Sequence, residues 1–450
     1  MAKDTSETRT DLEHVLAALE AGTVRQVQRL VGALHPAETA HLLEALPTAQ
    51  RRIVFDLVPE GDQGEVLVEL TDDVRASLVE GMEASKLVAA SEDLDLDDLA
   101  DFVGGLPEAV TAQVLHSLSQ RDRDRLNAVL SYPEDSAGGI MNPETIAVRA
   151  DVTLEVVMRY LRMLAYLPDK TAAIFVVDRN DRYMGALHVS RLLTRDPASV
   201  VGDVMDEDFP PIPASMTDTE VAREFKDRDL VAAPVVDERG QLIGQITVDD
   251  VVDVISEQAD EDIRRLAGLA EEDDMFAPVF TSARRRAVWL GINVATAFLA
   301  ASVVGAFRPT LDQVVVLAVL MPVVASMGGI AGNQVVTLMV RGLALGRIED
   351  SNARWLLAKE IGVALINGTG WAVVAALGTR LFTDDWVVGA IVGAALVVNL
   401  LTAAITGFAV PLALTKLRID PALAGTVVLT TVTDCVGFAA FLSLGTLFLT

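Results

Sequence analysis

The chain has a single cysteine, Cys435, among its 450 residues, and only 5% of its residues are aromatic. One thiol excludes an intrachain disulfide and a thiolate metal cluster. The five histidines all lie in the first half of the chain, without the spacing of metal ligands. The sequence contains no GxxxxGKS/T, HExxH or CxxC motif. These absences predict that the protein is not an enzyme and draws no energy from ATP hydrolysis.

Basic residues are also scarce, with 36 Lys and Arg against 64 Asp and Glu. Residues 284–450 contain 11 basic and 8 acidic residues, which leaves 25 and 56 for residues 1–283. Such an acidic first part argues against a nucleic-acid partner and suits multivalent cations, or is simply a solvated surface. The first fourteen residues, MAKDTSETRTDLEH, are polar, so we expect no cleavable signal.

Five apolar segments are long enough to span a bilayer. They cover approximately residues 287–307, 313–340, 361–379, 386–415 and 421–449. If the spans alternate, nine Lys and Arg residues flank them on one side, and only Arg308 and Arg380 lie on the other. Because positive charge favours the cytoplasmic side, we expect a cytoplasmic N-terminal part and an external C-terminus.

Asp434 is the only charged residue between Pro421 and Thr450. A carboxylate in an apolar span costs about 2.5–3.5 kcal/mol to insert, so it needs a partner or a water-filled path. An intramembrane ion or proton site is one interpretation, and a protonated or helix-paired structural residue is the other. In a two-fold dimer, two Asp434 side chains facing each other would favour a bound cation or a shared proton.

The spans also contain small and polar residues that suit either close helix packing or the lining of a path. In the second span, Pro322 and the glycines are expected to loosen the helix and free backbone carbonyls. The candidates for lining the path are Asn333, Gln334, Asn399, Gly328 and Gly329.

A repeat occupies residues 136–255. At an offset of 59, Val176-Val177-Asp178 matches Val235-Val236-Asp237, and Gly185 matches Gly244. Each copy is predicted to form strand, helix, strand, turn, strand and helix, with the glycine relieving a tight backbone. The repeat resembles a pair of CBS domains, a ligand-sensing module. That resemblance implies ATP or another adenine nucleotide as a ligand between the copies, although the chain has no Gly-rich phosphate loop.

Residues 10–131 show Leu and Val at three- and four-residue spacing with short proline-containing breaks, which predicts a superhelix of short helices. After the repeat, residues 251–269 are expected to form one connecting helix. Asp253, Glu257 and Glu261 repeat there every four residues, so they repel one another unless a cation intervenes. A solvated face or a frayed helix is the alternative.

The order of these parts, together with PVVASMGGIAGNQ and LTTVTDCVG, resembles the MgtE magnesium-transporter family. The resemblance implies a multidomain α-rich membrane protein with an α-superhelical N-domain, an α/β CBS pair and an all-α domain of five transmembrane helices. It also implies a homodimeric Mg²⁺ channel or transporter in the lipid bilayer of the bacterial inner membrane, which admits Mg²⁺ and is closed by cytosolic Mg²⁺. The expected boundaries are 1–135, 136–199, 200–256, 257–283 for the connecting helix and linker, and 284–450.

The resemblance also implies site residues. It places a pore carboxylate at Asp434, where a hydrated Mg²⁺ would suit a wide site. The implied regulatory positions are Asp97, Asp101 and Glu65 in the N-domain, Gly139 at its interface, Asp229, Asp250 and Asp253 in the CBS pair, and Glu261 and Asp262 in the connecting helix. Gln258 and Thr219 stand where acids are expected, and Ile330 replaces an Asn, so the number of regulatory ions stays open.

Two other functions are compatible with parts of the sequence. A membrane-anchored regulator that senses nucleotides through its CBS pair is one, but an anchor has no need of Asp434. A proton-coupled transporter of another divalent cation is the second, since Asp434 could itself titrate. An anion substrate is disfavoured, because the interiors of the spans contain no basic residues.

Overall fold

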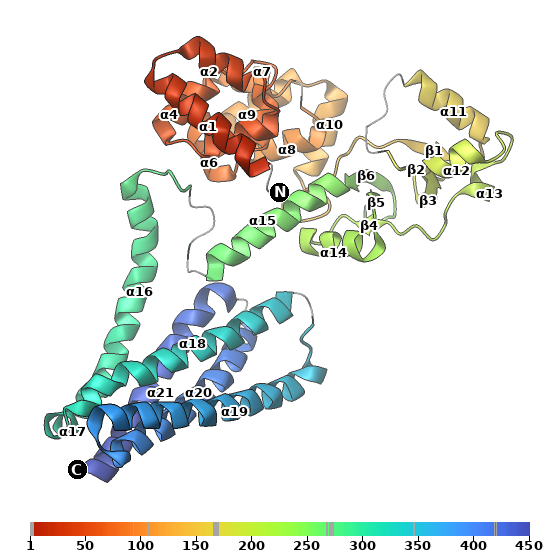
Figure 1. Ribbon diagram of the computed structural model, residues 1–450. Helices are drawn as coiled ribbons and strands as arrows, with labels where there is room; N and C mark the ends of the chain where they lie inside the picture. Colours follow the sequence, from red (N-terminus) through yellow and green to blue (C-terminus); the bar gives the residue numbers. More distant parts are fainter. Residues whose placement is uncertain are drawn as a thin grey trace. The chain divides into compact units, whose positions relative to one another are not determined.

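The structure is a computed structural model that describes residues 4–92, 94–106, 108–164, 171–266, 269, 274–344, 347–417, 419 and 421–450. The chain forms two compact units (Figure 1). The first comprises Met1–Ala259 together with Asp274–Pro278, and the second comprises Asp260–Asp273 together with Val279–Thr450.

The first unit begins with a stack of short helices, as the apolar spacing predicts. Prolines start helices here rather than merely separating them: Pro36 is the first residue of α3 and Pro47 is the N-cap of α4. His35 and Glu38 close a capping box around the start of α3. The helices are α1 (Asp4–Glu20), α2 (Val24–Val31), α3 (Pro36–Glu44), α4 (Thr48–Phe55), α5 (Gln63–Val68), α6 (Asp72–Val79), α7 (Ala84–Ala90), α8 (Leu96–Gly104), α9 (Glu108–Ser117) and α10 (Gln120–Val129).

Two three-stranded sheets follow, and they confirm the repeat. The first copy contains β1 (Ala147–Arg149), α11 (Leu154–Met163), β2 (Ala173–Val177), β3 (Tyr183–His188) and α12 (Val189–Thr194). The second contains α13 (Val201–Val204), β4 (Ile212–Pro213), α14 (Asp218–Arg228), β5 (Ala232–Val236), β6 (Leu242–Thr247) and α15 (Val248–Leu266). In both sheets a parallel pair of strands is followed by an antiparallel pair, with a bulge at the matching Val177 and Val236.

The turns of the two copies meet each other. Asp181 and Gly240, at matching positions, are the left-handed residues of the two turns. Leu242 donates its backbone N–H to the carbonyl of Asp181 over 3.0 Å, and Tyr183 donates in the same way to Gly240 over 3.0 Å. The two copies are therefore related by a local two-fold arrangement, as expected for a tandem repeat.

The matching glycines relieve a tight backbone, as expected. Gly185 and Gly244 lie inside strands β3 and β6, where another backbone crosses closely. A Cβ at Gly185 would lie 2.5 Å from the carbonyl oxygen of Asp206, and one at Gly244 would lie 2.8 Å from that of Asn142. The start of each copy thus covers the strand of the other: Asn142 exchanges backbone hydrogen bonds with Gln245, and Asp206 exchanges them with Ala186.

One apolar core joins the helical N-domain to the second CBS copy. It includes Leu42, Phe55 and Phe102 from the N-domain and Val235 and Ile246 from strands β5 and β6. The first CBS copy has a separate core around Ile174, Val176 and Leu187. The N-domain therefore packs as one body with the second copy, and this packing brings α8 and α15 to a common region.

The second unit is a helical bundle. Within the described residues it contains α16 (Val279–Ala306), α17 (Arg308–Gln313), α18 (Val316–Ala344), α19 (Asp350–Thr383), α20 (Trp386–Lys416) and α21 (Pro421–Leu449). Five of these are long and apolar enough to cross a membrane, which agrees with the five predicted spans. Helix α20 is the most buried and packs against α18, α19 and α21. At 34 residues, α19 is longer than the hydrocarbon core requires.

Helix α18 differs from expectation. It continues through Pro322 and the glycine run instead of opening there. Its glycines admit neighbouring side chains: a Cβ at Gly328 would lie 2.2 Å from Nδ2 of Asn399, and one at Gly332 would lie 2.6 Å from a methyl group of Leu429. Their main consequence is close helix packing.

Candidate functional site

Four aspartates form an acidic cluster in the first unit. Asp97, Asp98 and Asp101 come from the start of α8, and Asp250 comes from the first turn of α15. Each helix begins with acidic residues because carboxylates favour the positive end of a helix dipole. The shared core brings the two helix starts near each other, so that Asp97 and Asp250 interact electrostatically. The arrangement concentrates negative charge where two domains meet.

Burial and mutual repulsion make ionisation of these carboxyls difficult. Burial, together with the charges of Asp97, Asp95 and Asp101, raises the pKa of Asp98 to about 7. Burial likewise raises the pKa of Asp250 to about 7, with a contribution from Asp97. Burial also raises the pKa of Asp101 to about 6, although the nearby charge of Arg75 opposes this shift. Asp101 remains partly exposed to solvent. At neutral pH the cluster therefore carries charge that a counter-cation would stabilise.

Asp97 has the most constrained carboxylate of the cluster, and burial raises its pKa as well. Its Oδ2 accepts a hydrogen bond from Nδ2 of Asn142 over 3.0 Å, while its Oδ1 is buried without a partner in the described part of the chain. Asp250 is held by Thr247, whose backbone N–H donates to Oδ2 over 2.9 Å. The residues described do not, however, bring three Asp, Glu, His or Cys side chains together closely enough to hold a metal ion.

The other acids of the connecting region lie at the edge of this cluster or away from it. Asp253 and Glu257 are exposed on α15, and Glu257 contributes to the raised pKa of Asp101. Glu261 forms an ion pair with Arg265, one turn further along the same helix. The side chain of Asp262 lies outside the described residues.

Three further predicted positions are not part of the cluster. Glu65 on α5 and Asp229 after α14 are exposed, and neither is among the charges that raise the cluster's pKa values. Asp229 takes a left-handed conformation with φ of 52° and ends α14. Gly139 permits a close crossing, because a Cβ there would lie 2.3 Å from the carbonyl oxygen of Pro133.

In the second unit, polar side chains follow one face of α21. Thr426, Thr430 and Asp434 recur every four residues, and all three are half-buried. Asn333 of α18 lies beside this face, since Thr426 Oγ1 and Asn333 Oδ1 are 3.4 Å apart. In the part of the chain that the structure describes, the Asp434 carboxylate has no hydrogen-bond or ion-pair partner. Within the described residues, no contact supports the interpretation of Asp434 as a helix-paired structural residue.

The other candidates from the membrane segments divide into two groups. Asn399 is fully buried, donates to the carbonyl of Val324 over 2.8 Å, and fits against Gly328 and Gly437. Asn399 was predicted either to pack helices together or to line a path, and these contacts favour helix packing. Gln334 is exposed on α18, and Gly329 has no atom within 4 Å of an added Cβ.

Comparison with known proteins agrees with this division into parts. The model described as "Divalent cation transporter" matches residues 321–444, "MgtE intracellular N domain" matches residues 34–135, and "CBS domain" matches residues 137–197 and 201–257. The magnesium transporter MgtE of Thermus thermophilus is 33% identical over 440 residues, which cover 96% of this chain and 97% of that protein. The chain belongs to the MgtE family.

Other MgtE proteins are similar over the same extent. That of Bacillus subtilis is 25% identical, over 97% of this chain and 96% of its own length. A crystal structure of the cytosolic domain of the Mg²⁺ channel MgtE in complex with ATP is 34% identical to this chain, covers 54% of it and 99% of its own chain, and has a TM-score of 0.49. The matches to the three family models give the chain the domain order of a membrane transporter of divalent cations.

Sequence reasoning missed one member of the cluster, Asp98. It adjoins Asp97 in the same acidic first turn of α8, and that crowding was the available signal. The departure from the MgtE pattern at Gln258 and Thr219 has a structural counterpart. Gln258 Nε2 donates to Thr219 Oγ1 over 2.7 Å, so an uncharged pair stands where two acids were expected.

Proposed function

We propose that the protein is a homodimeric Mg²⁺ channel or transporter that moves Mg²⁺ into the cytoplasm and is closed by cytosolic Mg²⁺. The observation that carries the proposal is the carboxylate of Asp434, which has no partner among the described residues and lies on a polar face of a helix long and apolar enough to span a membrane. A carboxylate in that position requires water or a cation. Two copies related by a two-fold axis would bring two such groups to one path.

The nature of the polar face supports a hydrated ion. Asp434, Thr430, Thr426 and Asn333 offer oxygen atoms, which are the ligands that Mg²⁺ prefers. Mg²⁺ gives up its water reluctantly, so one carboxylate from each copy with retained water is a sufficient site. We include Gln334 and Gly329 among the residues that line the path, and leave Asn399 and Gly328 to helix packing.

The acidic cluster supports closure by cytosolic Mg²⁺. Asp97, Asp98, Asp101 and Asp250 repel one another, and a divalent cation among them would favour the arrangement that holds the N-domain against the CBS pair. Because no three carboxylates converge in the described residues, we infer that the ion keeps part of its water shell there. Asp253, Glu257, Glu261 and Asp262 are proposed as weaker, outer contacts; Asp229, Glu65 and Gly139 serve as structural positions.

Several ions are needed for sharp closure. A change from 1:99 to 99:1 between two states requires about 5.5 kcal/mol of differential binding. Coupling of about 1–2 kcal/mol for each ion would require more than one site. The positive-inside distribution supports a cytoplasmic N-terminal part and an external C-terminus. The bacterial origin of the similar MgtE proteins supports residence in a bacterial inner membrane. Binding of an adenine nucleotide between the CBS copies stays a prediction.

The experiment is Mg²⁺ uptake into liposomes that contain the purified full chain. We expect Asp434→Ala to reduce uptake to the level of empty liposomes. The matched control is Asp312→Ala, which removes an exposed acid from α17 and should leave uptake unchanged. Uptake by Asp434→Ala equal to that of the unaltered protein would remove Asp434 from the ion path and refute the proposal.

A further inference from the structure

Arg51 has the largest fully buried side chain of the described residues, although Arg is seldom buried. It lies in α4, and its Nε donates to the carbonyl oxygen of Leu43 over 3.0 Å. This bond fixes the plane of the guanidinium from within the N-domain. The two terminal nitrogens are left to face one direction, where their geometry matches a carboxylate.

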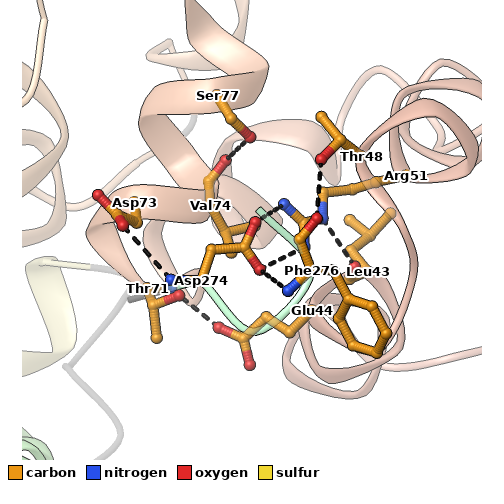
Figure 2. Close-up of polar contacts among 10 residues, drawn as sticks. All are labelled: Leu43, Glu44, Thr48, Arg51, Thr71, Asp73, Val74, Ser77, Asp274 and Phe276. Carbon is orange, nitrogen blue, oxygen red and sulfur yellow. Dashed lines mark hydrogen bonds and ion pairs between the residues drawn. The ribbon is translucent and has the colours of Figure 1, made fainter. Parts of the chain in front are cut away.

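That carboxylate belongs to Asp274, which is 223 residues away in the sequence but lies in the same compact unit. Nη1 of Arg51 is 2.8 Å from Oδ2 and Nη2 is 3.0 Å from Oδ1, so the pair is bidentate (Figure 2). Side-chain exposure is 0% for Arg51 and 8% for Asp274. Such a pair is far stronger and more specific than an ion pair on the surface.

Three more hydrogen bonds hold the same short segment. Thr48 Oγ1 donates to the backbone carbonyl of Phe276 over 3.3 Å, and the backbone N–H of Asp274 donates to Asp73 Oδ2 over 3.4 Å. The backbone N–H of Phe276 donates to Asp274 Oδ1 over 2.9 Å, which orients the carboxylate toward Arg51. Helices α4 and α6 together therefore bind the segment Asp274–Phe276 (Figure 2).

This segment has a particular place in the chain. It lies after the connecting helix α15 and immediately before α16, the first membrane-spanning helix, which begins at Val279. Through it, the N-domain holds the chain at a point that directly precedes α16 in the sequence. We propose that the Arg51–Asp274 clamp couples the position of the N-domain to the first membrane-spanning helix, by a route separate from α15. This coupling rests on the proposed closure by cytosolic Mg²⁺.

The physical basis is the cost of separating the pair. When the segment leaves, the fully buried guanidinium loses its carboxylate partner and must be rehydrated. The N-domain and the start of α16 therefore tend to move together. If Mg²⁺ at the acidic cluster fixes the N-domain, the clamp carries that constraint to the membrane segments.

The test uses the full chain in liposomes, with Arg51→Met and Asp274→Asn as separate variants. Asp274→Asn nearly preserves side-chain size and lies outside the helical core, so it tests the clamp even if Arg51→Met folds poorly. The matched control is Arg52→Met, which removes the neighbouring but exposed charge. Two quantities are measured: hydrogen exchange of the peptide that contains residues 274–278, and the cytosolic-side Mg²⁺ concentration that halves uptake.

We expect both clamp variants to exchange faster by about tenfold or more in that peptide. We also expect them to require several-fold more Mg²⁺ for half-inhibition, whereas Arg52→Met changes neither quantity. The double variant Arg51→Asp with Asp274→Arg reverses the two charges. It should restore part of the protection from hydrogen exchange and part of the Mg²⁺ sensitivity. Faster exchange with an unchanged Mg²⁺ requirement, or unchanged exchange, would overturn the coupling alone. Absence of Mg²⁺ inhibition in the unaltered protein would overturn the proposed function, and the coupling with it.

Discussion

The carboxylates of the acidic cluster and the carboxylate of Asp434 are the same chemical group in opposite situations. In the first unit, burial raises the pKa of Asp97, Asp98, Asp101 and Asp250, and the charge of Asp97 adds to the shift of the other three. In the second unit, Asp434 stands alone on its helix face. In the acidic cluster, several carboxylates can attract a cation, so we expect the removal of one of them to be tolerated. Among the described residues, Asp434 has no neighbouring acid that could replace it, so we expect its removal to abolish Mg²⁺ uptake.

The largest expected effect comes from comparing Asp434→Asn with Asp98→Asn. Loss of about 1.4 kcal/mol of ion stabilisation corresponds to about a tenfold change, and Asp434→Asn should reduce Mg²⁺ uptake by at least that factor. Asp98→Asn should change uptake in the absence of cytosolic Mg²⁺ by less than about twofold, because its neighbours remain. Initial uptake rates into liposomes measure both. Equal effects of the two variants would contradict the contrast.

A smaller effect is expected when the cluster is neutralised as a whole by Asp97→Asn, Asp98→Asn and Asp250→Asn. Removing the repulsion should stabilise the Mg²⁺-free protein, while the additional stabilisation by Mg²⁺ is lost. At a concentration ten times the Kd, that lost stabilisation is about 1.4 kcal/mol. The unfolding temperature of the full chain, with and without Mg²⁺, measures it.

A matched control neutralises three exposed acids of the N-domain, through Glu60→Gln, Glu80→Gln and Glu92→Gln. This variant changes net charge equally but leaves the cluster intact, so Mg²⁺ should still stabilise it. If the control and the cluster variant respond alike, long-range charge rather than the cluster is responsible.

The pH dependence gives a third test. The pKa values of Asp98 and Asp250 are raised from 3.8 to about 7, so the contribution of these two groups to stability is fully present below about pH 4 and is lost as pH rises through about 7. Protons and Mg²⁺ compete for the same carboxylates. Stabilisation by Mg²⁺, measured as a shift in unfolding temperature, should therefore be larger at about pH 8 than at about pH 5.5. The opposite trend would exclude these carboxylates as the binding groups.

The smallest effect is expected at the uncharged pair. Gln258→Glu with Thr219→Asp replaces a 2.7 Å hydrogen bond by two like charges. In the absence of Mg²⁺ this should cost about 1 kcal/mol of stability, and added Mg²⁺ should restore it. The control Gln258→Leu with Thr219→Val also breaks the bond, but Mg²⁺ should not restore its stability. Restoration of both variants would show that no cation site had been created.

The sequence predicted features with a regular period and failed where contacts are distant. Apolar spacing reflects local geometry, so the sequence was sufficient to predict the five spans, the repeat and the short N-terminal helices. Asp97 and Asp250 were found through a family pattern, whereas Asp98 was passed over. The partnership of Arg51 with Asp274 has no periodic signal, since it depends on two segments 223 residues apart. The packing role of Asn399 likewise depends on glycines of two other helices.

Asn142 belongs to three parts of the first unit at once. Its side chain holds Asp97 of the N-domain, its own position is the start of the first CBS copy, and its backbone completes strand β6 of the second. A shift of the Asp97 carboxylate is therefore transmitted to the second sheet through Asn142. The start of each CBS copy also forms backbone hydrogen bonds with the edge strand of the other copy. A single copy on its own would therefore have an unpaired strand edge. The CBS pair should consequently melt in a single transition, and the acidic cluster should melt with it.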